Sequence, residues 1–146
     1  MSARSTLVVR IGLGVLAISG AVLGVWAGLA PRSFYDDFPG FGRHWVSVDG
    51  PYNEHLVRDV GWLNLALTVV TVWAMVTLAR SLVLAILVGC LVVALPHLVY
   101  HAANLDGLST GDGTAEIISL ALGPAIAAAL LVLVARGDDT AGATSQ

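Results

Sequence analysis

Four long apolar stretches dominate this sequence and decide which folds are open to it. They cover residues 11–30, 60–79, 81–103 and 117–135, and they contain no Asp, Glu, Lys or Arg. Each is close to the length of about 20 residues that a helix needs to cross the hydrocarbon core of a bilayer. Their hydrophobicity is continuous rather than periodic, which is typical of membrane spans. The sequence therefore predicts an all-α fold, a bundle of four transmembrane helices.

Charge and cysteine content exclude several classes of protein. Charged residues make up 12% of the chain, about half of the share in an average soluble domain. The chain has seven Arg and no Lys, so a polybasic surface for nucleic acid is not expected. Cys90 is the single cysteine and excludes an internal disulfide. We therefore expect contacts with membrane lipid, and with a membrane protein partner or a second copy of the chain, but not with nucleic acid.

The chain is short enough to form one integral membrane domain, residues 1–136. Residues 137–146 are small and polar, which predicts a disordered cytoplasmic tail. The first span resembles a signal peptide because Arg4 and Arg10 precede it. Pro31 directly after the best cleavage site argues against cleavage, so we expect this span to be retained.

Arginine placement predicts the orientation. If both termini are cytoplasmic, the cytoplasmic flanks hold Arg4, Arg10, Arg80 and Arg136. The outer face then holds Arg32, Arg43 and Arg58, together with eight of the ten acidic residues. Short cytoplasmic flanks rich in Arg follow the positive-inside rule. We expect a multi-pass protein of the plasma membrane with both termini in the cytoplasm.

A row of glycines marks one face of the first span. Gly20, Gly24 and Gly28 are spaced four residues apart, and small residues at this spacing let two helices approach closely in lipid. We predict that this face packs on neighbouring helices of the same chain. Homo-oligomerisation through the same face is the alternative.

The segment 31–59 is expected to be a long aromatic-rich extracytoplasmic loop between the first two spans. It holds six of the ten aromatic residues: Phe34, Tyr35, Phe38, Phe41, Trp45 and Tyr52. Aromatic residues are enriched at membrane–water interfaces. The loop is therefore predicted to form an interfacial belt or a cap on the bundle; the alternative is a lid over an apolar ligand such as a lipid or a quinone.

Polar residues near this same face form the candidate pocket. His97 and His101 are spaced i, i+4 and share one helix face, and so do His55 and Asp59. The second and third spans are joined by about one residue, so their outer ends should be adjacent. The predicted ligand or metal pocket consists of His55, Asp59, His97 and His101, with Glu54 and Asn104 beside them.

Several chemistries fit such a pocket. Two His on one turn with a third His and a carboxylate suit zinc, one His from each helix suits haem, and His beside carboxylates suits proton handling. The plain alternative is that these polar groups only satisfy one another. The HxxxH pair lacks the Glu of the HExxH zinc proteases, and we assign no catalytic residue.

Two motifs carry a resemblance to known proteins. They are GPYNEHLVRDVG at residues 50–61 and PHLVYHAAN at residues 96–104. With the four-span layout, they resemble the DoxX-like small bacterial integral membrane proteins, and more closely uncharacterised actinobacterial membrane proteins of this size. The resemblance implies a four-helix membrane bundle and an accessory role beside redox or thiol-stress complexes.

The function expected from the sequence is non-enzymatic. We predict a binding or accessory membrane protein with a polar His/Asp pocket at the outer membrane face. The alternative is a redox membrane protein that binds a metal or haem through the His cluster.

Overall fold

The computed structural model describes residues 2–136, so the predicted tail 137–146 lies outside the described residues. In chain order the helices and strands are α1 (Ala3–Leu29), α2 (Pro31–Asp37), β1 (Pro39–Gly40), β2 (Arg43–His44), α3 (Glu54–Thr77), α4 (Arg80–Ala103) and α5 (Thr110–Arg136). The chain is essentially all-helical, as the sequence predicts.

Four of these helices, α1, α3, α4 and α5, are long and apolar enough to cross a membrane. They have 24 or 27 residues and all begin before the predicted spans, most clearly at Arg4 and Arg10 in α1, whereas α3 ends at Thr77, two residues before the predicted limit. The reason is that a helix need not end where the hydrocarbon ends, and long Arg side chains reach the interface from inside it. Length and composition make this a multi-pass membrane protein.

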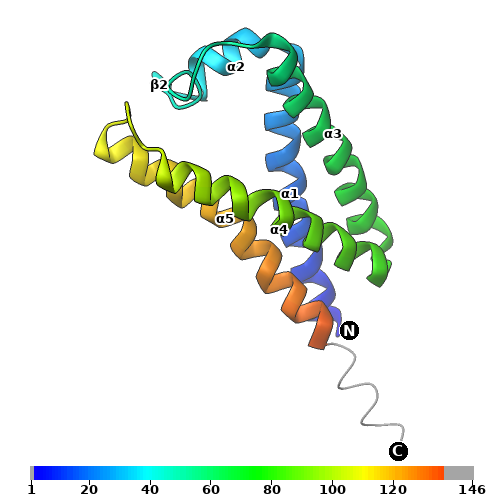
Figure 1. Ribbon diagram of the computed structural model, residues 1–146. Helices are drawn as coiled ribbons and strands as arrows, with labels where there is room; N and C mark the ends of the chain where they lie inside the picture. The colour runs from blue at the N-terminus through cyan, green and yellow to red at the C-terminus, as the bar shows by residue number, and fades with distance from the viewer. Residues whose placement is uncertain (1, 137–146) are drawn as a thin grey trace, which may run out of the picture.

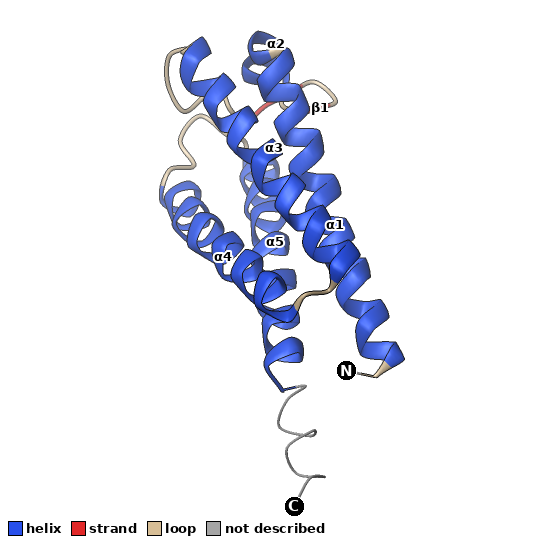
Figure 2. Ribbon diagram, turned by 90° about the vertical axis from the view of Figure 1, so that its right-hand side faces the viewer, coloured by secondary structure: helices blue, strands red, loops and turns tan. Residues whose placement is uncertain are grey.

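The long helices form two antiparallel pairs. Helix α1 packs along α3, and α4 packs along α5 (Figures 1 and 2). Leu78 ends α3 in a left-handed conformation, with φ 52°, and Arg80 already begins α4. The very short connection predicted between the second and third spans is therefore present, although the turn lies at Leu78 and Ala79.

The buried apolar core lies at one end of the bundle, which we call the turn end because it holds the Leu78 turn, the start of α1 and the end of α5. All four long helices contribute to this core: Val9, Leu13, Ala74, Val83, Ile86, Leu87, Ala127, Leu130 and Val134. Toward the opposite end the two helix pairs diverge (Figure 1). Packing at the turn end thus holds the pairs together and leaves their other ends apart.

Glycines set the close approach of α1 and α3. A Cβ atom at Gly61 of α3 would collide with the backbone nitrogen of Gly28 and lie 2.7 Å from its Cα. A Cβ atom at Gly24 would lie 2.7 Å from Leu65 Cγ, and one at Gly20 would lie 2.6 Å from Thr68 Oγ1. The glycine row of α1 therefore faces α3 within the same chain.

The segment expected as one long loop is instead partly ordered into regular structure. It contains helix α2 and a two-residue antiparallel hairpin in which Pro39 pairs with His44 and Gly40 with Arg43. Pro31 at the first turn favours a helix start. In the hairpin turn Gly40, Phe41 and Gly42 all have positive φ angles, which the two glycines adopt without a steric cost. We call residues 30–53 the cap, and the end of the bundle that they cover the cap end.

The close contact at Gly61 generates a stability prediction. Gly61→Ala forces α3 away from Gly28 and is expected to destabilise the protein by about 1–3 kcal/mol, as overpacking of a tight interface does. The measurement is the apparent melting temperature in mild detergent. Gly89→Ala in α4 is the matched control, because no heavy atom lies within 4 Å of its added Cβ. Equal melting temperatures for both variants would contradict the close packing described above.

Candidate ligand site at the cap end

A chain of aromatic rings joins α1 to the cap. Trp26, near the end of α1, contacts Phe34 and Phe38 with ring centroids 5.9 Å apart in each case. Phe38 then contacts Trp45 at 6.1 Å. Such edge and tilted ring pairs favour fixed orientations. Phe34, Phe38 and Trp45 therefore pack on one another and on α1 as a cap, whereas Phe41 is fully exposed.

Asp112 in the first turn of α5 ties this cap to the second helix pair. Its Oδ1 accepts a hydrogen bond from Trp45 Nε1 at 3.3 Å and lies 3.2 Å from Arg43 Nη1. Its Oδ2 accepts from the Ser109 hydroxyl at 2.7 Å, and its backbone N–H donates back to that oxygen. Trp45 is buried, with 7% of its surface exposed. The cap thus spans from α1 to α5 at the end where the helix pairs diverge.

The other edge of the cap is held by Arg32 of α2. Its Nε donates to Asp36 Oδ2 at 2.6 Å, and this hydrogen bond raises the pKa of the guanidinium above its ordinary value. The Arg32 guanidinium also lies over the rings of Tyr35 and Tyr52, 5.7 and 5.0 Å from their centroids. Tyr35 in turn donates its hydroxyl to the Gly50 carbonyl.

Beneath the cap, His101 of α4 meets two acidic residues. Its Nδ1 lies 3.0 Å from Glu116 Oε1 of α5 and 3.8 Å from Asp49 Oδ2 of the cap. The ring of His97, one turn earlier, packs edge-on against His101 with centroids 4.6 Å apart. We call His97, His101, Glu116 and Asp49 the His–Glu cluster. It brings together α4, α5 and the cap.

Glu116 is the unusual member of this cluster. It is only 4% exposed, and its Oε2 is buried without a hydrogen-bond partner among the described residues. A buried polar atom left without a partner costs about 1–3 kcal/mol, and more when the group is charged. The cluster can therefore accept a hydrogen bond from a donor group that enters it, or exchange a proton between His101 and Glu116.

The predicted pocket residues do not form one constellation. His55 and Asp59 pair with each other at 3.4 Å on the surface of α3, where the His55 side chain is 88% exposed. Glu54 accepts from Arg58 Nε at 2.8 Å, and Arg58 Nη1 donates to the Gly28 carbonyl at 2.6 Å. His55, Asp59 and Glu54 thus form local pairs on α3, and Arg58 alone of these side chains reaches the end of α1.

On α4 the predicted pocket is only partly present. His97 and His101 are neighbours as expected, but the Asn104 amide donates to the Tyr100 carbonyl of its own helix at 2.8 Å. The predicted adjacency of the outer ends of α3 and α4 is not observed, because α3 packs mainly along α1 and not along α4. The outer ends of α3 and α4 are therefore not held together as a simple hairpin would hold them.

Glu116 and Asp49, the partners of His101, are not among the residues predicted from the sequence. One signal was available: Asp112 and Glu116 are spaced i, i+4 and share a face of α5. An acidic residue on the core-facing side of a span is expensive and usually has a partner.

The described part of the chain contains no ready-made metal site. Across residues 2–136, no group of three or more His, Cys, Asp or Glu side chains is arranged so that it could hold a metal ion. The predicted zinc site required His55, Asp59, His97 and His101 to lie together. In the structure His55 pairs with Asp59 on α3, and His97 contacts His101 on α4.

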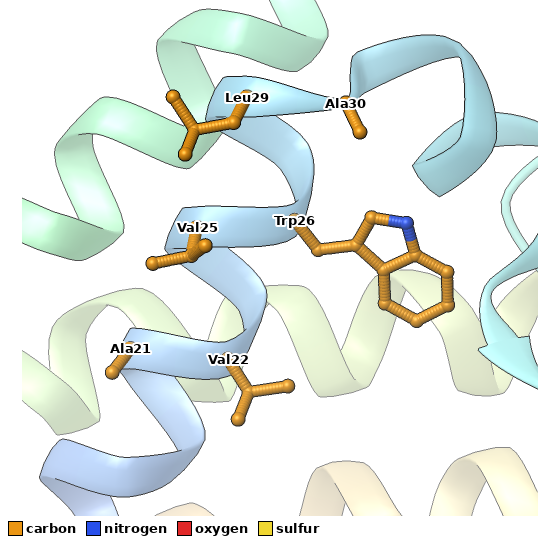
Figure 3. A pocket seen from close by; sticks show the side chains of 6 residues that line it. All are labelled: Ala21, Val22, Val25, Trp26, Leu29 and Ala30. Carbon is orange, nitrogen blue, oxygen red and sulfur yellow. The ribbon is translucent and has the colours of Figure 1, made fainter.

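An open, shallow apolar groove lies on the surface of the cap half of α1. It is formed by this one helix, between residues Ala21 and Ala30 (Figure 3). Its lining is Ala21, Val22, Val25, Trp26, Leu29 and Ala30. The one polar atom of these side chains, the indole N–H of Trp26, donates to the Ser33 hydroxyl at 3.3 Å. The groove thus offers only apolar surface.

Comparison of the chain with protein-family models, with curated proteins and with solved structures finds no match.

The contacts of Asp112 with Trp45 and Arg43 lead to a prediction about the cap. Asp112→Ala removes the acceptor of Trp45 and the partner of Arg43, so the cap should detach from α5 and expose Trp45. We expect chymotrypsin to cleave after Trp45 several-fold faster than in the parent protein, measured by mass spectrometry of the fragments. Asp106→Ala, in the exposed α4–α5 connection, is the control. Unchanged cleavage in Asp112→Ala would show that the contacts of Asp112 do not hold the cap on α5.

Proposed function

We propose that this protein is a non-enzymatic membrane binding protein that takes the polar group of its ligand at the His–Glu cluster. The observation that carries the proposal is the buried Glu116 Oε2, which lacks a hydrogen-bond partner within residues 2–136. Ionisable side chains inside membrane spans are costly, and they mark ligand sites, ion paths or proton relays. An unsatisfied carboxylate oxygen at the end of a span fits a ligand site.

The chemistry of the cluster defines what it would bind. Glu116 and Asp49 place two carboxylates on His101, whose ring supplies at most one positive charge. An ionised carboxylate only accepts hydrogen bonds. The ligand group that fits Glu116 Oε2 is therefore a hydrogen-bond donor.

Replacing Glu116 tests this function. Glu116→Gln keeps the shape of the side chain but removes its charge and one acceptor oxygen. Compounds retained through gentle detergent extraction should fall by about fivefold or more, the effect of losing about 1 kcal/mol of hydrogen bonding. Mass spectrometry of the purified protein measures this loss. The ligand-free variant should melt close to the parent protein, since Gln keeps the shape of the side chain and an oxygen that can accept a hydrogen bond from His101.

Glu54→Gln is the matched control, because Glu54 is an exposed glutamate that pairs with Arg58 on α3. It should retain the same compounds as the parent protein. If Glu116→Gln retains them equally and melts at a lower temperature, Glu116 has a structural role with His101 and the proposal is wrong.

We further propose that the cap end faces outward from the plasma membrane and that both termini are cytoplasmic. The support is the distribution of Arg in the short flanks at the turn end. Membership among DoxX-like proteins, and an actinobacterial origin, is likewise proposed from the two motifs at residues 50–61 and 96–104 alone. Under this proposal the aromatic cap is extracytoplasmic and the His–Glu cluster lies on the outer side of the membrane.

Reporter fusions test the orientation. A green fluorescent protein after Gln146 should fluoresce, whereas alkaline phosphatase at the same site should be inactive, because the phosphatase matures only outside the cytoplasm. Alkaline phosphatase inserted at Gly107, in the α4–α5 connection, should be active. The reverse pattern would invert the topology and place the cluster at the inner leaflet.

A further inference from the structure

A short segment of the cap lies between two anchored residues. We call residues 46–49 the flap; Trp45 precedes it and Gly50 follows it. The buried Trp45 donates its indole N–H to Asp112 of α5, and the Gly50 carbonyl accepts the hydroxyl of Tyr35 of α2. The flap is therefore held at one end on α5 and at the other end on α2.

Between these anchors, the flap contacts the second helix pair through Val48 and Asp49. A Cβ atom at Gly107, in the α4–α5 connection, would lie 3.5 Å from Val48 Cβ. Asp49 Oδ2 lies 3.8 Å from His101 Nδ1 of α4. Val48 and Asp49 are themselves exposed. One apolar contact and one long ion pair at the surface open at a lower free energy than a packed helix interface does.

The exposure of the side chains falls step by step from the flap to Glu116. The exposed fraction is 29% for Asp49, 12% for His101 and 5% for Glu116. Asp49 and Glu116 both lie beside His101 Nδ1, at 3.8 and 3.0 Å. The flap therefore lies on the solvent side of His101, and Glu116 lies on its inner side.

The helices around Glu116 are held more firmly than the flap. Helices α4 and α5 pack along each other and share a buried core that includes Leu87 and Leu130. Separating these helices to uncover Glu116 would disrupt that core. Lifting the flap breaks the surface contacts of Val48 and Asp49 instead. Of the two movements, the second costs less free energy.

From these observations we infer that the flap is a gate over Glu116. The carboxyl group becomes accessible from solvent when Val48 leaves Gly107 and Asp49 leaves His101, and it is enclosed again when these contacts re-form. This inference rests on the proposed function and adds how the ligand reaches its site. Closure excludes water from the ligand, and a hydrogen bond to Glu116 Oε2 is stronger in such surroundings.

An engineered disulfide that locks the flap tests the inference. Val48→Cys and Gly107→Cys are combined with Cys90→Ala, so that the chain keeps only these two thiols. Their predicted Cβ separation of 3.5 Å lies within the range of disulfides, about 3.5–4.5 Å. The oxidised and the reduced form of this one protein differ only in the lock, so the reduced form is the matched control.

A water-soluble carbodiimide with glycine ethyl ester measures the access, because it converts accessible carboxyl groups to amides. Mass spectrometry of peptides gives the labelling rate at each carboxyl group. We expect Glu116 to be labelled at least about tenfold more slowly in the oxidised than in the reduced form. Glu54, an exposed glutamate on α3, should be labelled equally in both forms.

Two results would overturn the inference. Equal labelling of Glu116 in the oxidised and reduced forms would show that solvent reaches it by another route. Labelling of Glu116 in neither the parent protein nor the reduced form would show that the flap does not open.

A second variant decides the question if the disulfide does not form or if Gly107→Cys, at a φ of 86°, does not fold. Asp49→Ala removes the contact of the flap with His101 and should speed the labelling of Glu116 about two- to fivefold relative to the parent protein. Asp59→Ala is the control, because it breaks another Asp–His pair, on the surface of α3. An unchanged or slower rate in Asp49→Ala would overturn the inference.

The failure of this inference is distinguishable from the failure of the proposed function, since labelling measures access and needs no ligand. If the lock stops labelling but the retained compounds do not depend on Glu116, the gate stands and the proposed function is wrong. If the retained compounds depend on Glu116 but the lock leaves its labelling unchanged, the proposed function stands and the gate is wrong.

Discussion

The close approach of α1 and α3 is the constraint on which the rest of the structure depends. Gly61 lets the two backbones meet at Gly28, at a distance that no side chain permits. In lipid, where apolar burial provides no driving force between helices, such backbone proximity supplies the packing energy. Because α3 is committed to α1 along its length, α4 finds its partner in α5. The molecule therefore consists of two helix pairs and not of four equivalent helices.

The two pairs share a core only at the turn end. There Val9 and Leu13 of α1 pack with Leu87 of α4 and Leu130 of α5. At the other end, the cap is what connects them, through Trp26 on one side and Asp112 on the other. A connection made by aromatic rings and a few hydrogen bonds is easier to open than a packed core. The turn end is therefore held by packed apolar side chains, and the cap end is held by the weaker contacts of the cap.

Much of the fold could be predicted from the sequence, because it depends on local hydrophobicity. Four apolar runs of membrane-spanning length allow few alternatives, and an Arg80 flanked on both sides by such runs requires a tight turn. The structure of the cap could not be predicted in this way. Helix α2 and the hairpin at residues 39–44 depend on Pro31, on Gly40 and on contacts with Trp26, and contacts across the chain leave no periodic signal.

The candidate site shows the same limit. The contact between His97 and His101 could be predicted from their i, i+4 spacing, because it depends on helix geometry alone. Their partners were not, because partner choice depends on which helices pack together. The short connection between α3 and α4 suggested that the partners of the His pair lie on α3. Instead α3 packs against the glycines of α1 through Gly61, and α4 packs against α5. Reading Gly61 together with Gly24 and Gly28 would have predicted the correct pairing.

The polar atoms at the cap end differ in what surrounds them. The carboxylates of Asp36, Glu54 and Asp112 each lie beside an Arg and near water, where such pairs contribute little to stability. Among the described residues, Glu116 is buried and lies 3.0 Å from His101, which in turn lies 3.8 Å from Asp49. Selection for stability alone favours an apolar residue at such a position, since replacing buried charges by packed hydrophobic groups often stabilises a protein. This cost of burying a carboxyl group is the reason why we propose that Glu116 binds a ligand.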